Sequence, residues 1–227
     1  MTLRAVLFDC DGVLVDSEPP TFAMLAEDFN RFGLTVTAVA VAERFTGGTI
    51  HDVAARARGM GADLPEGWAA DFYERLFVRL ERGVPVIAGV EEVLDRLDAA
   101  GITYAVGSNG VARKMAITLG PWPRLWDRLQ DRLFSGQELG MPKPLPGLWL
   151  HCAAHLGVDP ADCVVVDDSA VGCRGARAAG IRAMGFAAHG DGAGLVAEGA
   201  TVFRRMEELP GLLGLQALRP VRAVQAP

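Results

Sequence analysis

The chain has 227 residues, of which 50% are hydrophobic and 22% charged, and its formal net charge is −6. This length and composition are typical of a globular protein with one large domain, or with a core and a smaller insert. The acidic balance gives no general attraction for nucleic acid or an anionic membrane, so we expect neither as a partner. An anionic ligand would need a locally positive site.

Nothing in the sequence indicates a membrane span or a secreted protein. No apolar run approaches the roughly 18 residues of a membrane span, and the N-terminal MTLRAVLFDC lacks the layout of a signal peptide. The four cysteines show neither a CxxC pair nor zinc-ligand spacing: Cys10, Cys152, Cys163 and Cys173. We interpret them as small buried thiols in a reducing compartment and expect a cytoplasmic protein.

Short apolar runs alternate with helical patterns along most of the chain. The runs predict strands that are buried on both faces of a parallel sheet: residues 5–8, 102–106, 163–166, 182–186 and 200–203. Segments with apolar residues at helical spacing lie between them, each followed by glycine: residues 89–100, 145–156 and 171–179. This alternation predicts an α/β protein with a doubly wound parallel sheet.

Residues 18–86 interrupt the alternation. They contain no convincing strand but four helix-like stretches: residues 20–32, 38–45, 49–58 and 67–82. A crossover between parallel strands needs far fewer than about 70 residues. We therefore predict an inserted helical domain at 18–86 and a discontinuous core formed by 1–17 and 87–227. The tail after Leu215 is expected to be weakly ordered.

Polar residues follow the predicted core strands. Three strand ends carry them: Asp9 and Asp11, Ser108 and Asn109, and Asp167 and Asp168. Lys143 follows a loop at 135–142. Each residue alone has an ordinary explanation, as a helix cap, a turn residue or a surface charge. Because ligands of open α/β sheets bind outside the carboxyl ends of the strands, we expect the set to converge on one site.

Several carboxylates in one crevice repel one another, so they require a cation. Oxygen ligands without histidine or cysteine favour Mg²⁺, which usually binds a few carboxylates together with a substrate phosphate. The Ser108 hydroxyl and nearby backbone N–H groups would donate hydrogen bonds to phosphate oxygens. A carboxylate that faces an immobilised phosphate can act as a nucleophile and form an aspartyl-phosphate, which water then hydrolyses.

Four segments resemble the four motifs of the haloacid dehalogenase (HAD) superfamily: FDCDGVLVDSE, VGSNG, KPLPG and VVVDDSAVGCRGARAAG. The resemblance covers essentially the whole chain, including an insert of cap size after the first motif. It implies a Rossmann-like core with a mobile helical cap, Mg²⁺ as the cofactor, and phosphoryl transfer through an aspartate.

The same resemblance implies a role for each motif residue. Asp9 would be the nucleophile and a magnesium ligand, and Asp11 the general acid and base, with its backbone carbonyl on the metal. Ser108 and Lys143 would hold the phosphoryl group. The other residues implied are Asp167 and Asp168 for the metal, and Glu18, Thr46, Asn109 and Gly110 for the substrate.

Asp11 separates this chain from dehalogenase members, which lack the second aspartate. The resemblance is strongest to the β-phosphoglucomutase-like branch, through "DGVLVDSE" and "DDS". Mutases of that branch carry a histidine shortly after the first motif and a Lys-Gly…Arg element in the cap. This chain has Thr21 and then Thr46-Gly47-Gly48-Thr49-Ile50 at those points. We therefore expect a phosphatase that acts on a small phosphorylated metabolite, a sugar phosphate or sugar-acid phosphate.

A phosphosugar mutase is the alternative, and a non-catalytic phosphate-binding sensor on the same fold is a further one. Signalling receiver domains share the acidic pair and the lysine, but they need no helical insert. Some members of the branch act on 6-phosphogluconate and similar compounds, and this chain resembles them. Possible substrate contacts in the cap are Phe22, Arg44, Thr46, Thr49 and His51. No dimerisation signal is present, so we expect a monomer.

Overall fold

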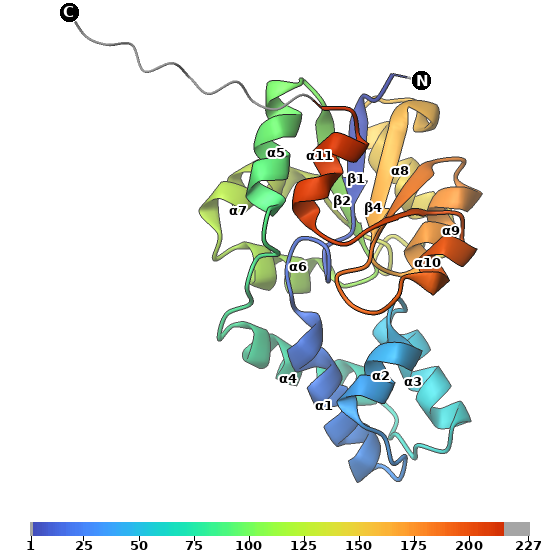
Figure 1. Ribbon diagram of the computed structural model, residues 1–227. Helices are drawn as coiled ribbons and strands as arrows, with labels where there is room; N and C mark the ends of the chain where they lie inside the picture. Colours follow the sequence, from blue (N-terminus) through green and yellow to red (C-terminus); the bar gives the residue numbers. More distant parts are fainter. Residues whose placement is uncertain (1, 216–227) are drawn as a thin grey trace, which may run out of the picture.

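The computed structural model describes residues 2–215, which form an α/β protein around one six-stranded sheet (Figure 1). The strands lie in the order β3-β2-β1-β4-β5-β6, and every neighbouring pair is parallel. Their bounds are β1 Ala5–Phe8, β2 Thr103–Ser108, β3 Leu133–Ser135, β4 Cys163–Asp167, β5 Arg182–Phe186 and β6 Thr201–Phe203. The predicted doubly wound sheet is confirmed, with β3 as a strand that the sequence did not indicate.

The central strands are buried on both faces, as their unbroken apolar runs predict. In β1, Val6 and Phe8 pack into one apolar cluster and Ala5 and Leu7 into the other, because successive side chains of a strand point to opposite faces. Helices on the first face are α5 Val90–Ala99, α6 Ala112–Leu119, α7 Pro123–Leu129 and α11 Leu209–Leu212. Helices on the second face are α8 Gly147–His155, α9 Ala170–Ala178 and α10 Ala193–Ala197.

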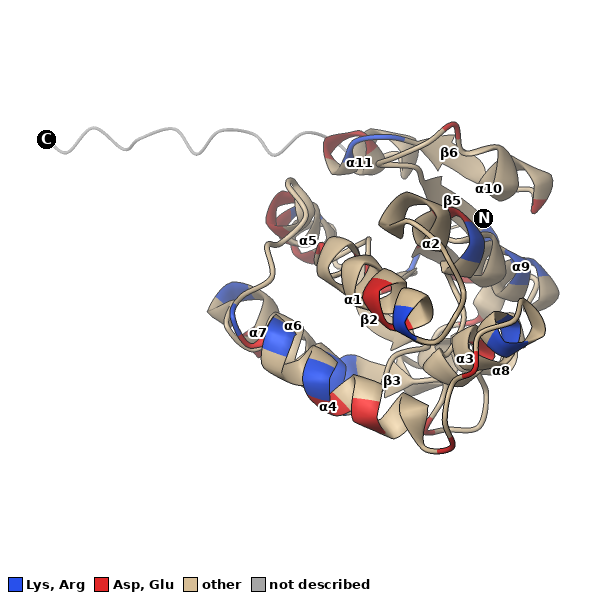
Figure 2. Cartoon of the chain, turned by 90° about the horizontal axis from the view of Figure 1, so that it is seen from below, with Lys and Arg blue, Asp and Glu red and all other residues tan. Residues whose placement is uncertain are grey.

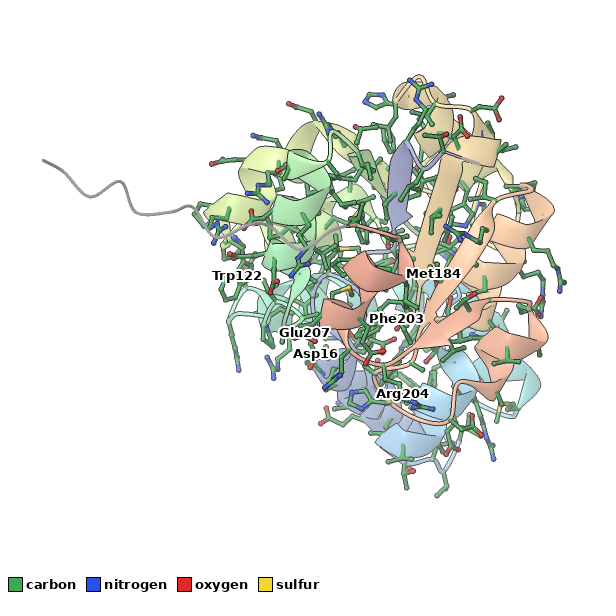
Figure 3. The ribbon with its side chains drawn as sticks, turned by 45° about the horizontal axis from the view of Figure 1, so that its top comes forward. Asp16, Trp122, Met184, Phe203, Arg204 and Glu207 are labelled. Atoms are coloured by element: carbon green, nitrogen blue, oxygen red, sulfur yellow. The ribbon has the colours of Figure 1, made fainter. Side chains whose placement is uncertain are left out.

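Three short 3₁₀ segments complete the core: η1 Gln130–Arg132, η2 Pro160–Asp162 and η3 Met206–Glu208. Residues Met184 and Phe203 lie in β5 and β6, beneath the C-terminal segment that carries η3 and α11 (Figure 3). Within residues 2–215, no helix has the length and apolar character that a membrane span requires. The expectation for the chain after Leu215 concerns residues outside the described range.

The chain reverses its winding direction at β1. Strand β2 pairs with one edge of β1 and β4 with the other, so Phe8 lies opposite both Val106 and Val166. The chain leaves β1 toward β2 and leaves the neighbouring strand β4 toward β5, in opposite directions along the sheet, which opens a crevice at the carboxyl edge of β1 and β4. Whatever follows Phe8 is therefore placed at the centre of the sheet, in this crevice.

Four helices form a separate layer beyond the carboxyl edge of the sheet (Figure 1). They are α1 Glu18–Arg31, α2 Ala38–Phe45, α3 Ile50–Gly59 and α4 Trp68–Leu80. Aromatic rings fill their interior, with the centroids of Phe29 and Phe45 5.1 Å apart and those of Trp68 and Phe72 5.0 Å apart. Helix α1 begins two residues earlier than predicted, because its two prolines occupy the first turn, where no backbone N–H is required.

Two adjacent linkers join this helical unit to the sheet. Val15 and Val86 form an antiparallel bridge, and the Asp16 N–H donates to the Pro85 carbonyl at 2.9 Å. The indole of Trp122 donates to the carbonyl of Val84 at 3.0 Å, which ties the second linker to the core (Figure 3).

A further contact joins the unit to the core through α4, which lies along α6 (Figure 2). The guanidinium of Arg113 pairs with Glu74 at 2.7 Å and lies 4.4 Å from the ring centroid of Phe77. The helical unit is therefore attached on the α4 side of the molecule.

The aromatic interior makes a prediction about stability. Phe29→Ala should lower the free energy of unfolding by about 3–5 kcal/mol, because it removes a fully buried ring and leaves a cavity. Val78→Ala, on a side chain that is 58% exposed, should change it by less than about 0.5 kcal/mol. Urea unfolding of the two variants measures both values, and equal losses would contradict the packing described here.

Candidate active site

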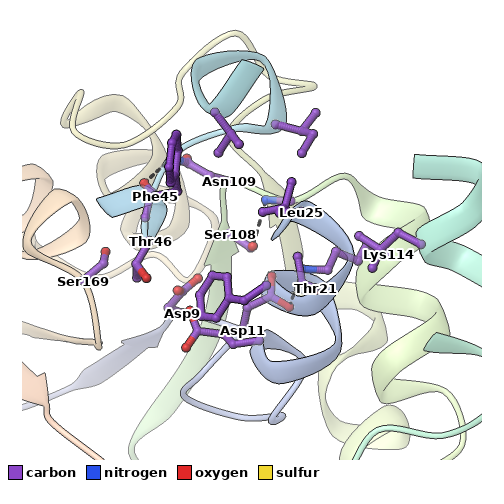
Figure 4. Close-up of a pocket in the computed structure, with 18 of the residues that line it drawn as sticks. Asp9, Asp11, Thr21, Leu25, Phe45, Thr46, Ser108, Asn109, Lys114 and Ser169 are labelled. Atoms are coloured by element: carbon purple, nitrogen blue, oxygen red, sulfur yellow. Dashed lines mark hydrogen bonds and ion pairs between the residues drawn. The ribbon is translucent and has the colours of Figure 1, made fainter. Parts of the chain in front are cut away.

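The polar strand ends meet in one cavity of about 110 Å³ between the sheet and the helical unit (Figure 4). Asp9 follows β1, and Ser108 is the last residue of β2. Lys143 reaches the cavity from the loop between β3 and α8. Nine of the site residues expected from the sequence line this cavity: Asp9, Asp11, Glu18, Thr46, Ser108, Asn109, Gly110, Lys143 and Asp168. Asp167, at the end of β4, is completely buried beside them.

Lys143 is the positive centre of the site. Its ammonium lies 2.8 Å from Asp9 Oδ1 and 2.8 Å from Asp167 Oδ2. It also lies 4.6 Å from the ring centroid of Trp149, which closes off the side away from the carboxylates. Burial disfavours the charged lysine, but the two carboxylates outweigh it and raise the pKa of Lys143. The side chain therefore remains cationic.

One lysine does not offset all the carboxylates around it. Burial, with repulsion from Asp167 and Asp11, raises the pKa of Asp9 to about 7 despite the opposing effect of Lys143. Burial and the charge of Glu18 likewise raise the pKa of Asp168 well above its ordinary value. The site has an excess of negative charge that a bound cation would remove.

Three carboxylates are placed to hold such a cation. Asp9, Asp167 and Asp168 each offer one oxygen, and these atoms lie within 4.8 Å of one another. All are oxygen donors, so the set suits a hard divalent ion. The Asp11 carboxylate lies outside this group, and metal contact through its backbone carbonyl stays a prediction.

Asp167 is held firmly by protein donors. Its Oδ1 accepts hydrogen bonds from the backbone N–H and the hydroxyl of Ser169, at 2.9 and 2.7 Å, while Oδ2 accepts from Lys143. A Cβ atom at Gly172 would lie 1.8 Å from Asp167 Oδ2, so no larger residue fits there. Within residues 2–215, no protein donor forms such a bond with the oxygens of Asp168, which makes it the more available ligand of the pair.

Asp11 has a partner that the sequence did not reveal. The Lys114 ammonium lies 2.8 Å from Asp11 Oδ1, and the buried Ser17 hydroxyl donates to the same oxygen. Burial opposes ionisation, but these two groups outweigh it and lower the pKa of Asp11. Lys114 lies on the buried face of α6 with Met115, Thr118 and Leu119. The spacing of those neighbours is the signal that could have identified it.

Asn109 fixes the loop that carries Lys143. Its Oδ1 accepts from the Lys143 N–H at 2.7 Å, and its Nδ2 donates to the Lys143 carbonyl at 3.0 Å. The same Nδ2 contacts the Gly47 carbonyl of the helical unit at 3.4 Å. The Gly110 N–H donates to the Ser108 hydroxyl at 3.0 Å. The side-chain amide of Asn109, which was expected to contact substrate, is thus hydrogen-bonded to protein groups.

The helical unit provides an apolar ceiling. Phe22, Leu25, Phe45 and Phe72 line this side of the cavity. Of the five cap residues expected as contacts, Phe22 and Thr46 line the cavity, whereas Arg44 and His51 are exposed and do not. The Thr49 hydroxyl caps α3 by accepting from the Asp52 N–H at 3.1 Å. The four cysteines are buried and free, as expected.

Comparisons with known proteins agree with this arrangement. The family model for haloacid dehalogenase-like hydrolases matches residues 3–180. The chain is 31% identical to the 6-phosphogluconate phosphatase of Escherichia coli (strain K12), over 92% of this chain and 94% of that protein. It is 32% identical to the phosphoglycolate phosphatase of Xylella fastidiosa (strain 9a5c), over 83% of each. A crystal structure of a HAD family hydrolase from Deinococcus radiodurans R1 with bound phosphate and sodium matches with a TM-score of 0.73 and 30% identity, covering 93% of this chain and 95% of that chain.

The raised pKa of Asp9 makes a prediction for the metal-free protein. The folded state binds the Asp9 proton more tightly than the unfolded chain does, so ionisation between about pH 4 and pH 7 costs stability. In EDTA at pH 8, Asp9→Asn should therefore be more stable than the wild type, by about 1–4 kcal/mol. The difference should vanish near pH 4.

Urea unfolding at the two pH values measures this effect. Asp63→Asn, at an exposed position of the helical unit, provides the control and should match the wild type at both. An Asp9→Asn variant that is less stable than the wild type at pH 8 would show that Lys143 alone offsets the carboxylates.

Proposed function

The chain belongs to the haloacid dehalogenase-like hydrolases and is a phosphatase, and we propose that it hydrolyses a small sugar phosphate or sugar-acid phosphate with the help of Mg²⁺. The observation that carries this proposal is the position of Asp9. Its carboxylate stands at the centre of the sheet's carboxyl edge, beside Lys143 and in the same cavity as Ser108 and Asp11. The groups that we propose as the nucleophile, the phosphate ligands and the proton-transfer group thus line one cavity.

Asp9 and Asp168 would be the main ligands of Mg²⁺. Asp167 would be a weaker ligand, because its oxygens already accept hydrogen bonds from Lys143 and Ser169. The ion, when bound, would neutralise the carboxylates and draw electron density from the phosphoryl oxygens. The pKa of Asp9 would then fall, so its oxygen would be ionised and nucleophilic at neutral pH.

Asp9 attacks the phosphorus of the bound ester. A bond forms between its carboxylate oxygen and phosphorus, and the bond from phosphorus to the leaving alcohol breaks. The Ser108 hydroxyl and the Lys143 ammonium bind the equatorial oxygens, where negative charge is spread in the transition state. The product of this step is an aspartyl-phosphate and the free alcohol.

Asp11 handles the protons. In its protonated form it donates a proton to the oxygen of the leaving alcohol. In the second step its carboxylate accepts a proton from the water that attacks the aspartyl-phosphate, which restores the protonated form for the next turnover. The contacts to Lys114 and Ser17 fix its carboxylate in the cavity and favour its ionised form, which is the form that acts on water.

The walls of the cavity favour hydrolysis over mutase chemistry. A mutase must bind a second phosphate, whereas the helical unit contributes no lysine or arginine to the lining within residues 2–215. Among the described residues, the cations that line the cavity are Lys114 and Lys143, which come from the core and are both ion-paired with carboxylates. The Thr21 hydroxyl is turned away to the Ser17 carbonyl, at 2.7 Å.

Phosphate release from a panel of sugar and sugar-acid phosphates tests the proposal. Release should require Mg²⁺, stop in EDTA, and fall by about a thousandfold or more in Asp9→Asn, because the nucleophile is lost. Asp63→Asn should retain wild-type activity. Undiminished release by Asp9→Asn, or in EDTA, would refute an aspartate-based mechanism. Conversion of β-glucose 1-phosphate to glucose 6-phosphate without release would establish the mutase.

Lys114 supplies a separate prediction. Its charge lowers the pKa of Asp11, so Lys114→Met should raise that pKa and move to higher pH the alkaline limb of the kcat/KM profile, where Asp11 loses the proton that it gives to the leaving alcohol. Arg113→Met changes the next residue, whose side chain is exposed, and should leave that limb in place. A limb that does not move in Lys114→Met would mean that a group other than Asp11 sets it.

A further inference from the structure

A second and larger cavity opens beside the first. It has a volume of about 760 Å³, against about 110 Å³ for the inner one. One wall is formed by Ala38, Val39, Ala42 and Glu43 of α2, and the opposite wall by residues 187–195, which run from the end of β5 into α10. We call this space, bounded by α2 and residues 187–195, the lateral cleft.

The two cavities are continuous at the reaction centre. Five residues line both: Glu18, Phe22, Thr46, Asp168 and Ser169. The inner cavity is closed above by rings such as Phe45 and Phe72, which belong to the packed interior of the helical unit. A leaving group longer than a few atoms therefore finds room only sideways, past Glu18 and Thr46.

The walls of the lateral cleft have one sign of charge. Its lining contains five carboxylates: Asp16, Glu18, Glu43, Asp168 and Asp191. No lysine or arginine of the described chain lines it, and His189 is its one imidazole. Arg204 donates to the carbonyls of Gly190 and Asp191 at 2.8 and 3.0 Å, and so holds the loop without lining the cleft (Figure 3). A bound cation would neutralise only the carboxylates near Asp9.

We propose that the lateral cleft receives the leaving group of the substrate and selects monophosphates whose remote end is neutral over those that end in a carboxylate or a second phosphate. A remote anion would face Glu43, Asp16 and Asp191, with no lysine or arginine of residues 2–215 in the lining of the cleft, and so would be repelled. Hydroxyl groups instead find carboxylate and backbone carbonyl acceptors there. This inference rests on the proposed function and narrows its substrate class.

A matched pair of esters tests it. D-Glucitol 6-phosphate and 6-phosphogluconate have the same carbon chain and differ only at the far end, an alcohol in one and a carboxylate in the other. Their kcat/KM ratio should favour the glucitol ester by about tenfold in the wild type. Glu43→Lys should reduce that ratio by about fivefold, since it reverses a charge in the cleft wall.

Two further variants separate local from general effects. Glu66→Lys makes the same charge change at an exposed position of the helical unit that lines neither cavity, and should leave the ratio unchanged. Ala42→Trp narrows the cleft and should raise KM for the glucitol ester by about tenfold.

The outcomes also distinguish this inference from the function on which it rests. A wild-type ratio at or below one, or equal shifts in Glu43→Lys and Glu66→Lys, would overturn the lateral cleft as the selective site. Phosphate release from the panel would meanwhile uphold the phosphatase. No release from any ester, p-nitrophenyl phosphate included, would remove the proposed function and this inference together.

Discussion

The site depends on an imbalance of charge around one buried ammonium. Lys143 contacts Asp9 and Asp167 at 2.8 Å, while Asp11 and Asp168 stand close behind. Much of the surrounding structure serves to keep this arrangement from relaxing. Trp149 closes the space beneath the ammonium, Asn109 clamps the backbone of its loop, and the absence of a side chain at Gly172 leaves Asp167 its place. Truncation of Trp149 or Asn109, or a side chain added at Gly172, would therefore disturb the arrangement of the carboxylates.

A second ion pair, between Lys114 and Asp11, gives Asp11 surroundings that differ from those of the other carboxylates. Lys114 and Ser17 hold Asp11 apart from the group formed by Asp9, Asp167 and Asp168, and they lower its pKa while burial raises those of Asp9 and Asp168. Asp9 and Asp11, two positions apart in the sequence, thus have pKa values that are shifted in opposite directions. The first step of the proposed mechanism needs the reverse, an ionised Asp9 and a protonated Asp11, so that mechanism depends on a bound cation to lower the pKa of Asp9.

The sequence predicted the frame of the fold better than its edges. Strands buried on both faces are long apolar runs and were found. Strand β3 has only three residues, of which Leu133 and Phe134 are half-buried and Ser135 is buried and polar, so no apolar run marks it. Strand β2 continues to Ser108 because Gly107 and Ser108 pair with β3, a segment distant in the sequence. Most of the motif residues could also be located, because they stand at the ends of the predicted strands. Lys114 and the lateral cleft could not, since both arise only when helices separated in sequence are brought together.

The two linkers enter and leave the helical unit side by side, joined by the bridge between Val15 and Val86. Because both ends of the segment meet at one point, its length and content can change without shifting the register of any strand. Evolution can therefore exchange the selective part of such a protein while the chemical part stays intact. Relatives with different substrates would then differ most between these two crossings, and chimaeras joined there should fold.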